Sequence, residues 1–204
     1  IIGDVTRLEA AAIAERLTEN LSSGGLKAEV SAVPIPVAET KRIPHPATQS
    51  HIQSAYPGLR RSDPDYFPLL VGNHILGGGG FVSRLMEEVR QKRGLAYSVY
   101  SFFAPYKEQG PFQIGLQTKK EQSEEALALT QKVLKEFVAS GPTEEELLAA
   151  KQNIIGGFPL RIDSNSKILS YLSMIGFYNL PLTYLTDYLV AVEAVTTEQI
   201  WQAF

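Results

Sequence analysis

Apolar residues recur at helical spacing near the start of the chain and then give way to a proline-rich stretch. Thr6 can cap a helix that ends near residues 22–25, with apolar positions at Leu8, Ile13, Ala14 and Leu17. Residues 1–4 before it are predicted to be the end of a strand. Residues 30–46 contain four prolines, which fix φ angles and lack backbone donors. They are therefore predicted to form an extended connector.

The next elements are predicted from alternation and from helix-start and helix-stop residues. Residues 47–56 alternate between two faces, as a strand does, and Pro57-Gly58 ends them. Asp63 followed by Pro64 is predicted to start a helix that Gly77 stops. A shorter helix is predicted to begin near Ser83 and to end at Gly94, with its buried positions at Val82, Leu85, Met86 and Val89.

The remainder predicts a hairpin followed by helices. Residues 95–104 and 111–117 are expected to form the two hairpin strands, in the centre of the sheet. Helices then dominate, with capping boxes predicted at Thr118–Glu121, Thr143–Glu146 and Thr196–Gln199. Later helices are expected over residues 164–177 and 181–194. The predicted fold class is α+β, with a mixed, mostly antiparallel sheet covered on one face by several helices.

Composition excludes several classes of protein. A chain of 204 residues with 44% hydrophobic content can bury a core, and its net charge of -3 gives no long-range field for a nucleic acid. Because there is no cysteine, disulfide scaffolds, thiolate zinc sites and cysteine nucleophiles are excluded. No apolar run is long enough for a membrane span. The compartment stays open, with the periplasm slightly favoured over the cytoplasm.

The most informative segment, residues 74–100, contains a run of four glycines followed by Arg90 and Tyr97. Arg90 and Tyr97 lie seven positions apart across a predicted helix-to-strand junction, so their side chains are expected to reach the same point. Simpler readings exist for each. Arg90 could interact with the helix dipole or pair with Glu87 one turn back, and Tyr97 could be a half-buried core tyrosine.

Residues 74–100, with Ser83-Arg84-Leu85 and Gly94-Leu95-Ala96-Tyr97-Ser98, resemble the pitrilysin or insulinase family of zinc metallopeptidases. The resemblance implies one half of a clamshell: a single noncatalytic domain over residues 1–204, excised from a carboxy-terminal half and trimmed at both ends. It implies that Arg90 and Tyr97 bind a peptide substrate near its scissile carbonyl. The implied partner is a sister domain or subunit that carries zinc.

The family's zinc motif, His-x-x-Glu-His, is absent from this chain. The three histidines, His45, His51 and His74, do not have ligand spacing on one helix. We therefore expect no metal ligand and no catalytic residue here, zinc only in the partner domain, and no hydrolysis by this chain alone.

The glycines Gly77, Gly78, Gly79 and Gly80 allow several interpretations. They follow a helix and lack the Gly-Lys-Ser or Gly-Lys-Thr ending of a phosphate loop, so the simplest reading is a link between two helices. By analogy with a glycine-rich loop of the related mitochondrial processing peptidases, they could form a substrate flap. Two further hypotheses remain: a structural or assembly module of the same fold, as in respiratory complexes, and an anion-binding protein that uses this loop.

Overall fold

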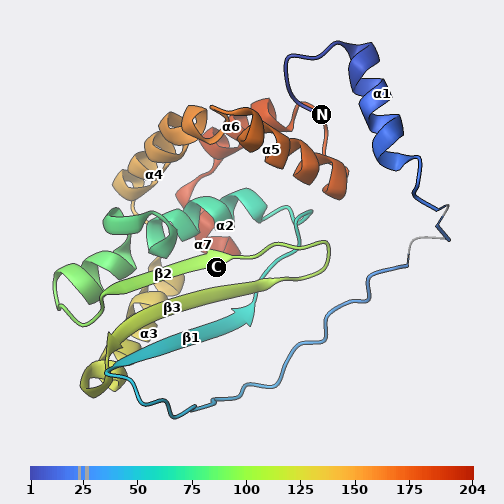
Figure 1. Ribbon diagram of the computed structural model, residues 1–204. Coiled ribbons are helices and arrows are strands. Elements are labelled where there is room, and N and C mark those ends of the chain that lie inside the picture. The colour runs from blue at the N-terminus through green and yellow to red at the C-terminus, as the bar shows by residue number, and fades with distance from the viewer. Residues whose placement is uncertain (23, 26–27) are drawn as a thin grey trace.

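The computed structural model describes residues 1–22, 24–25 and 28–204, and Figure 1 shows a small sheet with most helices on one side. The strands are β1 (Gln49–Pro57), β2 (Ser98–Phe103) and β3 (Pro111–Lys119). The α-helices are α1 (Arg7–Thr18), α2 (Tyr66–Asn73), α3 (Ser123–Ser140), α4 (Glu144–Gly157), α5 (Asn165–Tyr178), α6 (Tyr184–Ala194) and α7 (Thr197–Ala203). Short helical segments are η1 (His74–Gly78), η2 (Gly80–Val82), η3 (Met86–Gln91), η4 (Lys120–Gln122) and η5 (Phe158–Arg161).

The sheet has the strand order β1-β3-β2, with both neighbouring pairs antiparallel. Side chains alternate along the central strand, so Phe112, Ile114 and Leu116 are buried on one face. Leu116 lies opposite Ile52 of β1 and Val99 of β2, so the three strands contribute to one apolar layer. This confirms the predicted α+β class with a sheet covered on one face.

The other face of the sheet carries polar and aromatic side chains. Tyr100 and Phe102 of β2 stack with ring centroids 6.2 Å apart and planes 21° apart. The Tyr100 ring lies over Gly115, where an added Cβ would come within 2.5 Å of it, so a larger residue at this position would displace the ring. Gln53 donates to the Tyr100 hydroxyl at 3.4 Å. The aromatic pair is therefore held flat on the open face.

The hydrophobic core lies among the helices and between them and the buried face of the sheet. Helix α3 buries Ala126, Val133 and Phe137, and α2 lies between β2 and the outer helices α4 to α6 (Figure 1). Helix α7 joins these layers through the fully buried Ile200. Within the described part of the chain, no helix combines the length and the apolar character needed to cross a bilayer.

Helix α1 stands apart from this core. Its predicted start is confirmed, since Thr6 and Glu9 form a capping box. None of its residues is buried, however, and Leu8 and Leu17 remain 84% and 72% exposed. The extended connector over residues 30–46 is also confirmed. The strand predicted for residues 1–4 is wrong, because no described strand lies beside them to pair with.

Two predicted helix starts are wrong because the polar side chain that was expected to cap the helix makes a different hydrogen bond. The Asp63 carboxylate accepts from the Asp65 amide at 3.1 Å and closes a turn, so the helix begins only at Tyr66. Thr118 lies buried in β3, where its hydroxyl donates to the Leu95 carbonyl at 2.6 Å. Helix α3 accordingly begins only at Ser123, after η4. The boxes at Thr143–Glu146 and Thr196–Gln199 are confirmed.

The hairpin of β2 and β3 is confirmed, but its predicted place in the sheet centre is wrong for β2, which forms an edge. Asn73 covers that edge: its amide donates to the Ser101 carbonyl at 3.2 Å, and the Ser101 hydroxyl donates back at 2.7 Å. Strand β2 also begins three residues later than expected, at Ser98. Asn73 leads directly into η1, which therefore packs against the strand.

Candidate functional site

A tight helix-to-strand turn sets the positions of Arg90 and Tyr97. Gly94, with φ 62°, takes a conformation that favours glycine, and its amide donates to the Arg90 carbonyl at 2.9 Å. Leu95 is buried, and its amide donates to the Val89 carbonyl at 2.9 Å. The Tyr97 amide then joins the sheet by donating to the Gln117 carbonyl at 2.9 Å. Both ends of the turn are therefore fixed by backbone hydrogen bonds.

The turn brings the two predicted side chains together. The guanidinium carbon of Arg90 lies 5.6 Å from the centroid of the Tyr97 ring. Tyr97 is 73% exposed, so the interpretation as a half-buried core tyrosine is wrong. The expectation that both side chains reach one point agrees with this contact.

Arg90 has no carboxylate partner among residues 1–22, 24–25 and 28–204. Glu87, the alternative partner one turn back, instead pairs with Lys92 at 2.9 Å. The contacts of the Arg90 guanidinium in the described chain are two rings, Tyr97 and, at 4.7 Å, Phe81. Ring contacts of this kind use no N–H donor of a guanidinium, so they leave the donors of Arg90 free for a ligand.

The glycine-rich loop is closely packed at its start and exposed at its tip. Gly77 is buried in η1 against β2, and a Cβ there would meet the Ser101 amide nitrogen at 2.7 Å. Gly80, with φ 67°, turns the chain into η2, which exposes Phe81 and Val82 at 64% and 77%. The prediction that Val82 is buried is therefore wrong. The loop presents an apolar tip instead of bare glycine backbone.

Ser83 and Arg84 hold the loop and the short helix after it. The hydroxyl of Ser83, a fully buried residue, donates to the Gly80 carbonyl at 2.7 Å. Arg84 donates to both carboxylate oxygens of Glu146 at 2.6 and 2.7 Å and to the Gly141 carbonyl at 3.1 Å. Burial opposes ionisation of Glu146, but hydrogen bonds from Arg84 and from the Thr143 amide outweigh it and lower the pKa of this carboxyl. The charged pair ties the site to α4.

The histidines do not assemble a metal centre in the described residues. His45 and His51 are exposed in the connector and in β1, and His74 begins η1. Nowhere in the described ranges do three or more His, Asp or Glu side chains gather where they could hold a metal ion. The Nε2 atom of His74 is buried and has no hydrogen-bond partner in the described chain. Burial and the charge of Arg161 lower the pKa of His74.

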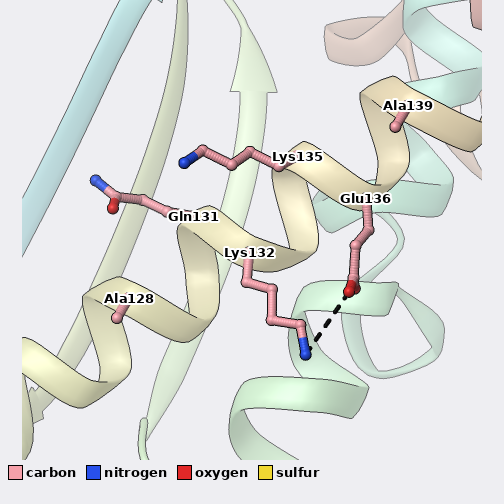
Figure 2. Close-up of a pocket in the computed structure, with 6 residues that line it drawn as sticks. All are labelled: Ala128, Gln131, Lys132, Lys135, Glu136 and Ala139. Atoms are coloured by element: carbon pink, nitrogen blue, oxygen red, sulfur yellow. Dashed lines mark ion pairs between the residues drawn. The ribbon is translucent and has the colours of Figure 1, made fainter.

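Two surface hollows lie outside the site. Figure 2 shows one, of about 490 Å³, whose lining side chains all project from α3; among them Lys132 and Glu136 pair at 3.7 Å. The second, of about 580 Å³, lies where β1, the hairpin, α3 and α7 meet, and its lining is mainly apolar, including Phe103, Phe112 and Phe204. Neither contains Arg90, Tyr97 or an acid–base pair suited to catalysis.

Sequence reasoning missed Phe81 because it treated the loop as glycines alone. The signal that could have found it is an aromatic residue directly after a glycine run and nine positions before an arginine. The role of the glycines as a flap and the roles of Arg90 and Tyr97 in binding substrate stay predictions.

Comparison with known protein families gives a match over most of the chain. The family model described as "Peptidase M16 inactive domain" matches residues 1–154. A crystal structure of a peptidase M16 inactive domain from Pseudomonas fluorescens superposes with a TM-score of 0.92 at 44% identity, covering 98% of this chain and 48% of that one.

Two curated relatives match over shorter stretches. The "Non-peptidase homolog YmxG" of Helicobacter pylori is 37% identical over 124 residues, which are 60% of this chain and 28% of that protein. The "Uncharacterized zinc protease YmxG" of Bacillus subtilis is 34% identical over 121 residues, 59% of this chain and 29% of that protein. The matched stretches thus span less than a third of these relatives, and the chain about half of the Pseudomonas fluorescens one. The resemblance to zinc peptidases is confirmed at the level of the domain, and this chain belongs to the family of peptidase M16 inactive domains.

Proposed function

We propose that this domain is the substrate-holding, noncatalytic half of a zinc metalloendopeptidase, in which Arg90 and Tyr97 bind the backbone of an extended peptide. The observation that carries the proposal is the juxtaposition of the two side chains at one exposed place. The Arg90 guanidinium lies over the Tyr97 ring, and neither the guanidinium nor the Tyr97 hydroxyl has a hydrogen-bond partner in the described chain. Donors that the fold itself leaves unused are available to a ligand.

The chemistry of the pair suits a peptide carbonyl. A guanidinium offers a permanently charged fork of donors, and a phenol offers one directional donor. When a carbonyl carbon is attacked, its oxygen gains negative charge, so both donors stabilise the transition state more than the ground state. Because every peptide has the same backbone, this contact alone would select weakly among side chains.

The chemical step belongs to a sister domain or subunit. In our proposal that partner carries His-x-x-Glu-His and binds zinc, whereas this domain supplies neither ligand nor general base. Support comes from the family match, since the family is described as an inactive domain. The isolated chain is accordingly expected to hydrolyse no peptide. A periplasmic location stays a prediction, which cell fractionation would check.

Kinetics of the complete protein, together with its zinc-bearing domain or subunit, would test the assigned roles. We expect Arg90→Ala to lower kcat/KM about a hundredfold and Tyr97→Phe to lower it roughly tenfold, as loss of a donor at a developing oxyanion does. Arg93→Ala is the matched control, because Arg93 is an exposed arginine three residues further along the chain. Unchanged rates in both site variants, with the control also unchanged, would refute the assignment.

A second candidate is a structural or assembly module of the same fold with no peptide contact. The Helicobacter pylori relative, named "Non-peptidase homolog YmxG", supports this candidate. The two candidates differ in peptide binding. A labelled extended peptide should bind the complete protein in an Arg90-dependent way if the domain holds substrate, and should not bind if it serves assembly alone. The flap role of Gly77–Gly80 also stays a proposal, with its exposed tip the part able to reach a peptide.

A further inference from the structure

Phe81 adds an apolar element to the same site. Its ring centroid lies 4.7 Å from the Arg90 guanidinium carbon, closer than the ring of Tyr97 at 5.6 Å. Although it makes this contact, Phe81 remains 64% exposed, and the adjacent Val82 is 77% exposed. An aromatic ring and a valine left in water beside free hydrogen-bond donors form a surface that a ligand can bury with a gain in free energy.

Side-chain hydrogen bonds anchor the backbone at Phe81. The Gln91 side-chain amide donates to the Phe81 carbonyl at 2.6 Å, and Gln91 follows Arg90 directly in η3. The preceding residue, Gly80, is held by the Ser83 hydroxyl at 2.7 Å. The backbone that carries Phe81 is thereby anchored beside Arg90, so an apolar contact at Phe81 and a polar contact at Arg90 can be made by one ligand.

The separation limits which part of a peptide reaches Phe81. In an extended peptide, consecutive residues advance by about 3.3 Å and their side chains alternate between faces. A ring 4.7 Å from the guanidinium carbon therefore lies within about one residue of the carbonyl that Arg90 binds. We infer that Phe81 is a specificity-determining residue. It forms an apolar subsite for one large apolar side chain of the peptide, next to the carbonyl that Arg90 binds. This inference rests on the proposed function and adds a side-chain preference to it.

Binding of a peptide series to the complete protein tests the inference. The probes are fluorescent, otherwise polar peptides of Ser, Thr and Ala in which a single Phe is moved along the sequence, with the Phe-free host as reference. Anisotropy gives Kd, and chromatography checks that the peptide stays intact. We expect the best Phe peptide to bind about tenfold tighter than the host, the scale typical of one apolar group in a pocket.

The variants separate the two proposals. Phe81→Ala should abolish the tenfold preference by weakening the best Phe peptide about tenfold more than the Phe-free host, Phe81→Leu should keep most of the preference, and Arg90→Ala should weaken all peptides alike. Leu182→Ala, at a leucine 88% exposed elsewhere on the surface, is the control and should change nothing. If Phe81→Ala keeps the preference, or weakens host and Phe peptides equally, the subsite is refuted while an Arg90 effect still supports the proposed function. If Arg90→Ala changes no affinity, the proposed function fails, and the subsite fails with it.

Discussion

The Arg84–Glu146 pair supports a quantitative prediction about how the site is held in place. Arg84→Met keeps most of the stem of the side chain but removes two charge-assisted hydrogen bonds to Glu146, one to the Gly141 carbonyl, and the contact of the guanidinium carbon 5.0 Å from the Phe137 ring. The variant would also leave the half-buried carboxylate of Glu146 unpaired. We therefore expect it to destabilise the fold well beyond an ordinary surface substitution.

The magnitude follows from these contacts. Hydrogen bonds to charged groups contribute about 1.5–3 kcal/mol each when buried, and a cation–π contact about 0.5–1 kcal/mol. The side chains of Arg84 and Glu146 remain 24% and 30% exposed, so water still screens the pair. The contacts also share one guanidinium, so their values do not add and most of the sum is lost. The expected decrease in the free energy of unfolding is about 2–3 kcal/mol.

Urea unfolding followed by circular dichroism measures this decrease, because urea is uncharged and does not screen the pair. Lys132→Met is the matched control, because the Lys132–Glu136 pair lies on α3 with side chains 68% and 61% exposed and a separation of 3.7 Å. The control should change stability by less than about 0.5 kcal/mol. If Arg84→Met costs no more than the control, the reasoning that this pair anchors the site is wrong.

Three further predictions address other parts of the chain. The pKa of His74 is lowered in the fold, so the unfolded state binds a proton on this side chain more readily than the folded state does. The free energy of unfolding should therefore fall as the pH drops below about 6.5. His74→Phe should flatten this pH dependence in denaturant titrations, whereas His51→Gln should not. Removal of residues 1–46 should shift Tm of the remaining domain by less than about 3 °C, because none of the described residues in this stretch is buried and the ion pair of Arg42 with Glu124 is exposed. Arg61→Met should lower stability by about 1–2 kcal/mol in urea titrations, because the Arg61 guanidinium donates to the hydroxyls of Tyr66 and Tyr184 and joins α6 to the start of α2; an unchanged midpoint would contradict it.

Much of the fold was predictable because local signals agree with the tertiary structure. The Thr143–Glu146 and Thr196–Gln199 boxes use only residues within one turn, so packing does not override them. Thr118 has the same spacing to a glutamate but lies on the buried face of β3, where its hydroxyl donates a hydrogen bond to the Leu95 carbonyl. The spacing of residues in the sequence cannot reveal this competing hydrogen-bond partner.

The candidate site was predictable in part for a similar reason. Gly94 marks the turn that joins Arg90 to Tyr97, and the sequence shows this directly. Phe81 lies between two π-helical segments, η1 and η3, which widen the helices on both sides of the loop, and Arg90 belongs to the second. No periodicity in the sequence signals this widening, so the position of the loop tip could not be foreseen.

A double-mutant cycle on the complete protein tests the central claim most directly, namely that Arg90 and Tyr97 act together on one peptide carbonyl. The measurement is kcat/KM, or peptide Kd if the protein binds without cutting, for Arg90→Ala, Tyr97→Phe and the double variant. Two donors to one oxygen should be coupled, so the double variant should lose little more than Arg90→Ala alone. Losses that multiply, or single variants with no loss, would contradict the account.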